Sequence, residues 1–280
     1  MDNNGQERVS SVGGPEQQKP ERAAHNDGHA DRRSASRPDV VQAGCRRLLP
    51  HHAARIQQSG INEETARARG YWSATTQAEV QRLGFSRSQC GAPGLIAPIW
   101  SLDGDVVLYQ TRPDQPRVLR EGSSKYETPK GCRLRIDVPP SVRTKVTDQT
   151  VPLFIVVGIR QADAAVTKGL CCLGLLQPHG WKRQDDFWNR VPLEKRPVYV
   201  VCDSQVALTP PSAVAFEELF AFLKGRGAEP KFIVLPPSKD GKKLALDDYF
   251  YSISFHAVIL CLANHDFRCD SRAWRLRARW

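Results

Sequence analysis

Three aspartates follow apolar segments of the chain and could hold a metal ion. Asp203 comes directly after the apolar run 198–202, and Asp247 and Asp248 follow the apolar residues 244–246. Ligands of parallel sheets lie outside the carboxyl ends of the strands, so we expect these carboxylates at one edge of a sheet. Carboxylate oxygens are ligands that Mg²⁺ prefers. The three are therefore candidate Mg²⁺ ligands, with Asp203 also a candidate catalytic residue. The alternative is that each aspartate caps a helix or faces water.

Two segments predicted to be loops, 111–117 and 125–131, combine basic side chains with one aromatic residue, Tyr126. Arginine and lysine contact phosphates, and an aromatic ring can stack on a base. Ordinary solvated loops contain the same residue types, so both interpretations stay open. The candidate nucleic-acid-binding residues are Arg112, Arg117, Lys125, Lys130 and Arg160.

The composition favours a polyanionic partner. The chain has 280 residues, of which 40% are hydrophobic, and a formal net charge of +10. Such a basic balance suits nucleic acid, although a bias toward Arg codons would produce it too. The eight cysteines form no Cys-x-x-Cys pair, which indicates reduced thiols in a cytoplasmic protein and not a zinc site or a disulfide framework. We expect no membrane partner, because the sequence has no secretory signal and no apolar run of spanning length.

Strands and helices are predicted to alternate through residues 149–250, which indicates an α/β domain with a mostly parallel sheet. Runs of apolar and β-branched residues predict the strands, and Gly or Pro residues mark the ends of the helices. The strands are expected at 151–157, 170–176, 198–202 and 231–235, and the helices at 161–168 and 210–224.

The preceding segment, 45–148, is predicted to be a smaller α+β unit. It should begin with a helical hairpin. Residues 48–60 form the first helix of this hairpin, and Asn62 caps a second helix over 63–69, which ends at Gly70.

A β-hairpin is expected next, with strands at 94–100 and 106–110 joined by a turn at Asp103-Gly104. Both ends of the chain differ from the rest in composition. Residues 1–44 contain almost no large apolar side chains and are predicted to be a disordered tail, whereas 251–280 show no assignable pattern.

Several of these segments resemble the Toprim-like domain of phage- and plasmid-borne primase or replication proteins, together with the segment that precedes that domain. The likeness covers roughly residues 48–250, and its motifs occur in the right order. It implies a Toprim fold that binds nucleic acid, in which a strand-end Glu followed by Gly acts as acid or base and an Asp-x-Asp pair binds Mg²⁺. The motifs that carry it are 59–61, 69–71, 110–117, 125–131, 151–165, 198–205, 235–237 and 246–249.

Two positions depart from the acidic pattern that the resemblance implies. Val157 stands where the Glu is expected before Gly158, and Gln205 stands where the second Asp is expected after Asp203. Asp163 matches a family position, which makes it a second candidate catalytic residue. The loss of two anions weakens a Mg²⁺ site, since ligand charge sets the affinity for hard cations. Either the domain binds nucleic acid without catalysis, which we favour, or other acids serve, or the gene is decaying.

The predicted function is that of a Toprim-like protein that binds DNA or RNA in the replication or priming of a mobile genetic element. Its Mg²⁺-dependent phosphoryl transfer is expected to be impaired or absent. The chain has no Walker-type phosphate loop, and a replicative helicase on a separate chain is a candidate partner. One alternative is a non-catalytic interaction module that recruits a helicase or another replication protein. Another is an α/β domain whose ligand is not nucleic acid.

Overall fold

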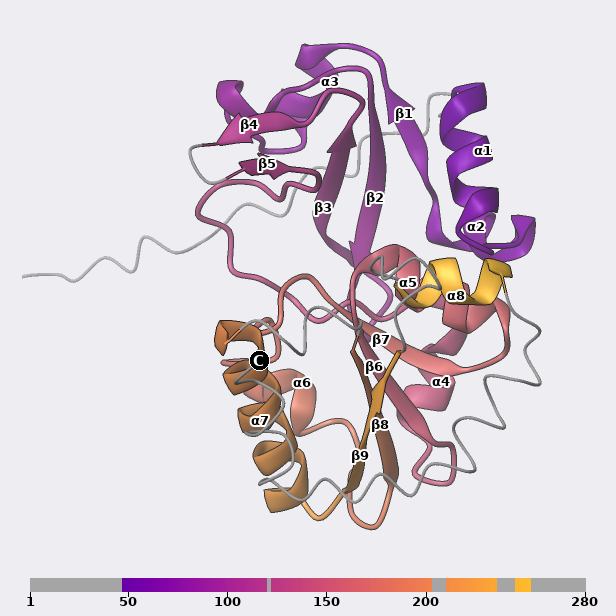
Figure 1. Ribbon diagram of the computed structural model, residues 1–280, viewed down its shortest axis with the longest axis vertical. Helices are drawn as coiled ribbons and strands as arrows, with labels where there is room; N and C mark the ends of the chain where they lie inside the picture. Colours follow the sequence, from indigo (N-terminus) through magenta and orange to yellow (C-terminus); the bar gives the residue numbers. More distant parts are fainter. Residues whose placement is uncertain (1–46, 120–121, 203–209, 236–244, 253–280) are drawn as a thin grey trace, which may run out of the picture. The chain divides into compact units, whose positions relative to one another are not determined.

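A four-stranded parallel sheet with the strand order β7-β6-β8-β9 is the central element (Figure 1). The computed structural model describes residues 47–119, 122–202, 210–235 and 245–252. The strands are β6 (Leu153–Val157), β7 (Cys171–Leu175), β8 (Pro197–Cys202) and β9 (Glu229–Val234). Strands β6 and β7 are buried along nearly their whole length, as expected where both faces are covered. The predicted α/β fold with a mostly parallel sheet is confirmed.

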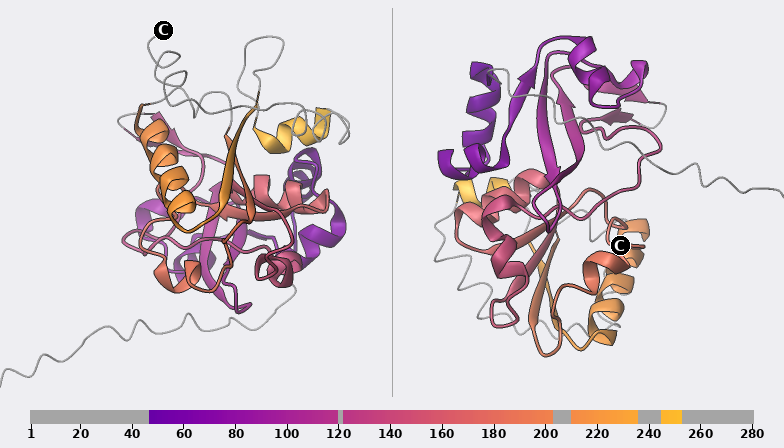
Figure 2. Two further views of the ribbon diagram at one scale, coloured as in Figure 1. Left: turned by 90° about the horizontal axis from the view of Figure 1, so that it is seen from below. Right: turned by 180° about the vertical axis from the view of Figure 1, so that it is seen from behind.

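The order of the strands places helices on both faces of this sheet. Helix α5 (Ile159–Thr167) connects β6 to β7, toward one edge of the sheet. Helix α7 (Pro210–Gly225) connects β8 to β9, toward the opposite edge. Since such crossovers are right-handed, the two helices lie on opposite faces, as Figure 2 shows. The direction of winding therefore changes between β6 and β8. In open α/β sheets, ligands bind outside the carboxyl ends of the strands at this switch point.

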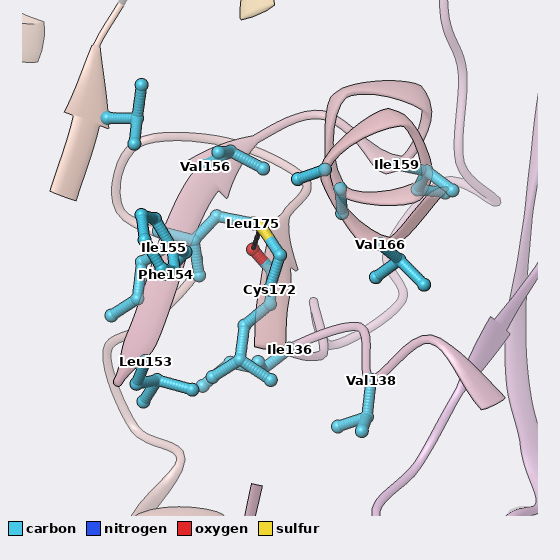
Figure 3. Packing of buried hydrophobic residues seen from close by; sticks show 14 of the residues in the cluster. Ile136, Val138, Leu153, Phe154, Ile155, Val156, Ile159, Val166, Cys172 and Leu175 are labelled. Atoms are coloured by element: carbon cyan, nitrogen blue, oxygen red, sulfur yellow. Dashed lines mark hydrogen bonds between the residues drawn. The ribbon is translucent and has the colours of Figure 1, made fainter. Parts of the chain in front are cut away.

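The sheet and α5 share one hydrophobic core (Figure 3). Ile155 of β6 and Leu175 of β7 are almost fully buried, and Ile159 and Val166 of α5 belong to the same cluster. Truncation of one such side chain to alanine costs about 2–5 kcal/mol of stability. The cysteines of the described residues are free, and burial raises the pKa of the Cys171 thiol to about 11.

A second sheet has three antiparallel strands, β1 (Trp72–Ala74), β2 (Gly94–Trp100) and β3 (Val106–Pro113). The predicted hairpin is confirmed. However, β3 continues through residues that were expected to form a loop, because Thr111 pairs with Ile96 and Arg112 pairs with Leu95. Arg112 therefore projects from a strand and not from a loop. Strand β1 was not predicted, since three residues are too few to show an alternating pattern.

The predicted helical hairpin is confirmed as α1 (Pro50–Gln58) and α2 (Glu63–Arg69). The side chain of Asn62 accepts a hydrogen bond from the Thr65 N–H at 2.8 Å, which satisfies a free donor of the first turn of α2. Gly70 ends this helix with a φ of 79°, a left-handed conformation that suits glycine.

The remaining elements are α3 (Gln77–Arg82), η1 (Arg87–Gln89), β4 (Arg117–Leu119), β5 (Gly122–Ser124), η2 (Pro140–Val142), α4 (Arg143–Val146), α6 (Asp185–Trp188) and α8 (Leu246–Ser252). Among the described residues, no helix is both long and apolar enough to cross a membrane. The predicted tail 1–44, Asp203, Gln205 and most of 251–280 lie outside the described residues.

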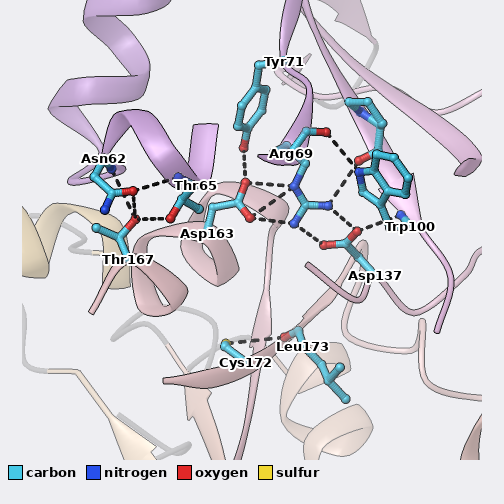
Figure 4. Close-up of polar contacts among 11 residues, drawn as sticks. Asn62, Thr65, Arg69, Tyr71, Trp100, Asp137, Asp163, Thr167, Cys172 and Leu173 are labelled. Atoms are coloured by element: carbon cyan, nitrogen blue, oxygen red, sulfur yellow. Dashed lines mark hydrogen bonds and ion pairs between the residues drawn. The ribbon is translucent and has the colours of Figure 1, made fainter. Parts of the chain in front are cut away.

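A buried ion cluster joins the N-terminal elements to the parallel sheet (Figure 4). Arg69, at the end of α2, donates through Nη1 to Asp137 Oδ1 at 2.5 Å and through Nη2 to Asp163 Oδ1 at 2.6 Å. All three charged side chains are fully buried. The ion cluster and the hydrophobic core therefore both include residues from each side of the domain boundary expected near residue 148. The division of the chain into domains at that point stays a prediction.

Candidate nucleic-acid interface

Arg160 lies in the first turn of α5, directly beyond the end of β6. Gly158 joins the two elements with a φ of 122°, a conformation that residues with a side chain rarely adopt. Gln161 Nε2 donates to the Val157 carbonyl at 2.8 Å, and the Leu246 N–H donates to Gln161 Oε1 at 3.4 Å. Helix α8 therefore lies beside α5 (Figure 1). Arg160 directly follows the carboxyl end of β6, which is one of the two strands that border the switch point.

The guanidinium of Arg160 is held by two partners, and its Nε has no acceptor among the described residues. Its Nη1 donates to Ser59 Oγ at 2.7 Å, and its Nη2 lies 3.3 Å from Asp247 Oδ2. Its Nε is buried and has no hydrogen-bond acceptor within the described residues. Buried polar groups in native proteins are nearly always paired, so a free N–H of this kind indicates a missing acceptor.

Two guanidinium groups lie close to the ring of Tyr126. The Cζ atom of Arg112 is 5.2 Å from the centre of the Tyr126 ring, and that of Arg160 is 5.7 Å from it. Arg112 Nη1 also donates to Tyr126 Oη at 3.0 Å. Burial lowers the pKa of Arg112, and the charges of Arg160 and Arg55 lower it further. We call Arg55, Arg112, Arg160 and Tyr126 the arginine cluster.

This cluster has the features of a site for phosphates. Three cations are gathered here, and the charges of Arg160 and Arg55 disfavour the charged form of Arg112, an effect that an anionic ligand would relieve. Arg112 has no carboxylate partner within 4 Å among the described side chains, so its charge is available to a ligand. Guanidinium groups bind phosphate with paired hydrogen bonds, and a tyrosine ring offers a surface on which a base can stack.

Two of the predicted Mg²⁺ ligands lie at this edge in different environments. Asp247 is buried and paired with Arg160, and burial raises the pKa of its carboxyl group despite that neighbouring charge. Asp248 is exposed and accepts a hydrogen bond from the Ala245 N–H at 3.1 Å. Asp248 therefore caps the first turn of α8, which is the alternative given above for such an aspartate.

The described donors at this edge do not fit a Mg²⁺ ion. Val157, at the carboxyl end of β6, offers no side-chain oxygen, and Asp247 already faces the cationic Arg160. A hard cation needs several oxygen ligands with uncompensated negative charge. Asp203 and Gln205 follow β8 outside the described residues, so their contribution stays a prediction.

Asp163, a candidate catalytic residue, lies apart from this edge in the buried ion cluster (Figure 4). Its Oδ1 accepts hydrogen bonds from Nε and Nη2 of Arg69, at 3.1 Å and 2.6 Å. Its Oδ2 accepts one from Tyr71 Oη at 2.7 Å. With both oxygens occupied and none exposed, the side chain cannot reach a substrate. We assign Asp163 to the support of the sheet and not to chemistry.

The other predicted nucleic-acid-binding residues are not brought into the arginine cluster. Arg117 forms a two-point ion pair with the buried Glu127, with both N–O distances at 3.0 Å. Lys125 and Lys130 are exposed on the segment that flanks Tyr126. These two lysines are placed to add long-range attraction to a polyanion, whereas Arg117 is already neutralised.

Sequence reasoning missed Arg55, which belongs to the cluster and lies on α1, and Ser59, which accepts a hydrogen bond from Arg160 in the turn after that helix. Arg55 has no special local pattern, because any amphipathic helix carries such a cation on its polar face. The Ser59–Arg160 hydrogen bond joins positions 101 residues apart, so no local signal could have shown it.

No family model and no curated protein sequence matches this chain. Solved structures of DNA primases do match its fold. The zinc-binding and RNA polymerase domains of the Aquifex aeolicus primase align with a TM-score of 0.55 and 13% identity, over 77% of this chain and 56% of that one. The DnaG catalytic core aligns with a TM-score of 0.55 and 11% identity, over 81% and 75% of the two chains.

A third match is the RNA polymerase domain of the Mycobacterium tuberculosis primase DnaG in complex with double-stranded DNA. It aligns with a TM-score of 0.52 and 13% identity, over 81% of this chain and 76% of that one. This chain thus spans little more than half of the Aquifex structure and about three quarters of the other two. At these identities the likeness concerns the fold alone: the chain has the mixed α/β fold of the catalytic cores of DNA primases.

Proposed function

We propose that the protein binds the phosphate backbone of DNA or RNA at the arginine cluster, in the replication or priming of a mobile genetic element. The observation that carries the proposal is the guanidinium of Arg112, which has no carboxylate partner within 4 Å among the described residues and lies beside Tyr126. A phosphate would supply the missing negative charge. The neighbouring Arg160 would add to the positive charge, and Tyr126 would supply a stacking surface.

Phosphoryl transfer is absent or impaired under this proposal. The described part of the sheet edge offers an apolar Val157 and an Asp247 that is paired with a cation. Arg160 therefore occupies the place where a metal-binding site would need negative charge. The sheet edge keeps its affinity for a phosphate. Its described residues do not offer the ligands of a metal ion that would activate this phosphate for transfer.

The fold of DNA primase cores supports a role in replication or priming, and one similar primase domain was crystallised with double-stranded DNA. A mobile-element setting, a cytoplasmic location and a helicase on a separate chain belong to the proposal as well. A chain that binds a nucleic-acid strand without synthesising on it would depend on such a partner for enzymatic steps.

The test is the binding of a fluorescent single-stranded DNA oligonucleotide to the full chain, measured by anisotropy in EDTA and again in Mg²⁺. We expect equal affinities in the two conditions, since no metal ion is needed. Arg112→Gln should weaken binding, whereas Arg117→Gln should weaken it far less, because Arg117 is already paired with Glu127. Absence of binding at low salt would contradict the proposal and favour the interaction module.

Catalysis is tested separately by calorimetric titration of Mg²⁺. The proposal predicts no saturable heat for the unmodified chain. Saturable Mg²⁺ binding that Asp203→Ala removes would instead show a working metal site. DNA binding could still hold in that case, so the two parts of the proposal can fail independently.

A further inference from the structure

Two adjacent histidines of α1 converge on one aspartate at the end of β3. His51 Nε2 lies 2.8 Å from Asp114 Oδ2, and His52 Nε2 lies 3.0 Å from Asp114 Oδ1. The three candidate ligand atoms all lie within 4.8 Å of one another. Imidazole nitrogens with one carboxylate oxygen form a donor set that suits Zn²⁺ and neighbouring transition-metal ions, and not Mg²⁺.

The second ring nitrogen of His52 is also positioned by the fold. His52 Nδ1 lies 2.7 Å from Ser73 Oγ, and the Leu49 N–H donates to the same oxygen at 2.8 Å. Histidines that bind metals usually donate their other N–H to an oxygen of this kind, which fixes the orientation of the ring. The side chain of His52 is fully buried while that of His51 is half exposed, so the site is rigid on one side and open on the other.

We propose that His51, His52 and Asp114 bind one Zn²⁺-type transition-metal ion, with a fourth position open to water. The ion would replace the two imidazole–carboxylate hydrogen bonds, with small shifts that bring each ligand to about 2.0–2.2 Å from the metal. It would fasten the first turn of α1 to the end of β3, across 62 or 63 residues of chain. The simpler alternative is that the hydrogen bonds alone serve this purpose.

Arg55 distinguishes these two interpretations. Its Nη1 lies 3.5 Å from Asp114 Oδ1, so its charge opposes a metal ion at the same carboxylate. If the metal site exists, Arg55→Gln should tighten metal binding severalfold, because the competing cation is gone. If Asp114 only forms hydrogen bonds with the histidines, Arg55→Gln creates no metal affinity.

The experiment uses the full chain without a histidine tag, stripped of metal and titrated with Zn²⁺ by calorimetry and with Co²⁺ by visible absorption. We expect one ion per chain at this site and a Co²⁺ spectrum with nitrogen and oxygen ligands. His51→Ala should weaken binding at least tenfold while the protein stays folded, since His51 is half exposed. The matched control is His179→Ala, at an exposed histidine of another segment.

Cysteine is the competing ligand that the experiment must separate from this site. Cys132→Ser removes a partly exposed thiol and should leave the titration unchanged. A Co²⁺ spectrum with thiolate charge-transfer bands would overturn the proposal. So would an absence of binding, or a binding isotherm that His51→Ala leaves as it was.

Discussion

The guanidinium of Arg160 lies 3.3 Å from the carboxylate of Asp247, at the carboxyl end of the parallel sheet. The sequence suggested opposite uses for these residues, since Arg160 was expected to bind nucleic acid and Asp247 to bind Mg²⁺. Their contact means that each reduces the availability of the other. A phosphate must compete with Asp247 for Arg160, whereas a metal ion would have to displace Arg160 from Asp247. We propose that the pair serves phosphate binding.

Asp247→Asn should therefore strengthen the binding of single-stranded DNA. The substitution frees Arg160 from a competing anion, and the expected gain is about two- to fivefold, the equivalent of ~0.5–1 kcal/mol for one ion pair. Anisotropy with a labelled oligonucleotide measures it. Asp248→Asn is the matched control, because it removes the same charge from an exposed neighbour whose carboxylate accepts a hydrogen bond from the Ala245 N–H. Weaker binding by Asp247→Asn than by this control would contradict the account.

Tyr126 should contribute through its ring more than through its hydroxyl group. Tyr126→Ala removes the surface between Arg112 and Arg160 and should cost about 1–3 kcal/mol of binding free energy, the usual value for one stacked base. Tyr126→Phe keeps the ring, loses only the hydrogen bond from Arg112, and should bind nearly as well as the unmodified chain. Equal losses in both variants would show that the hydroxyl group, and not stacking, matters.

Arg69 should be essential for stability. Arg69→Ala leaves Asp137 and Asp163 buried without their counter-ion, which typically costs about 3–5 kcal/mol. Urea denaturation followed by tryptophan fluorescence measures the free energy of unfolding. Arg67→Ala, two positions earlier on α2, removes an exposed pair with Glu63 and should cost less than about 0.5 kcal/mol.

If Arg69→Ala fails to fold, Tyr71→Phe tests the same ion cluster with a smaller loss of stability. It removes the hydrogen bond from Tyr71 to Asp163, with an expected cost of about 1–3 kcal/mol. A variant as stable as the unmodified chain would refute the supporting role assigned to Asp163.

The stability of the fold should decrease as the pH falls below 6.5. Burial holds the pKa of His52 below that ordinary value, and this effect outweighs the opposing influence of Asp114. The unfolded chain then binds a proton at this imidazole at a pH where the folded chain does not, so the free energy of unfolding falls until the folded imidazole is protonated as well. Asp114, whose pKa is lowered, contributes a separate loss only below about 3.8.

Urea denaturation at a series of pH values checks this window in metal-free buffer. His52→Gln should flatten the dependence just below pH 6.5, whereas His179→Gln, at an exposed histidine, should not. An unchanged pH profile in His52→Gln would show that another group causes the loss.

Local signals made part of this fold predictable. Asn62 and Gly70 bracket α2 as expected, because capping depends on residues within one turn of the helix. The parallel sheet was predictable because its strands are continuous apolar runs without alternating polar residues. Strand β1 and the extension of β3 were not predictable, since both exist through pairing with β2 and have weak patterns of their own.

The site was less accessible to sequence reasoning than the fold. Asp163 resembled a catalytic residue, but its role depends on Arg69, which lies 94 positions away in the chain. Arg112 and Arg160 were identified as separate basic residues, and only the folded chain shows that both lie close to the ring of Tyr126. Side-chain partners from distant segments decide whether a charged residue supports the fold or faces a ligand.

The salt dependence of single-stranded DNA binding tests the central claim most directly. The slope of log K against log salt concentration reports the number of phosphates that the protein neutralises, at about 0.7 per phosphate for a single strand. For Arg112→Gln/Arg160→Gln we predict a slope smaller by about 1.4, with clearly weaker binding at low salt. The control Lys224→Gln/Lys231→Gln, at exposed lysines of α7 and β9, should change both much less. An arginine double variant with the slope and affinity of the unmodified chain would contradict the claim that this cluster binds the phosphate backbone.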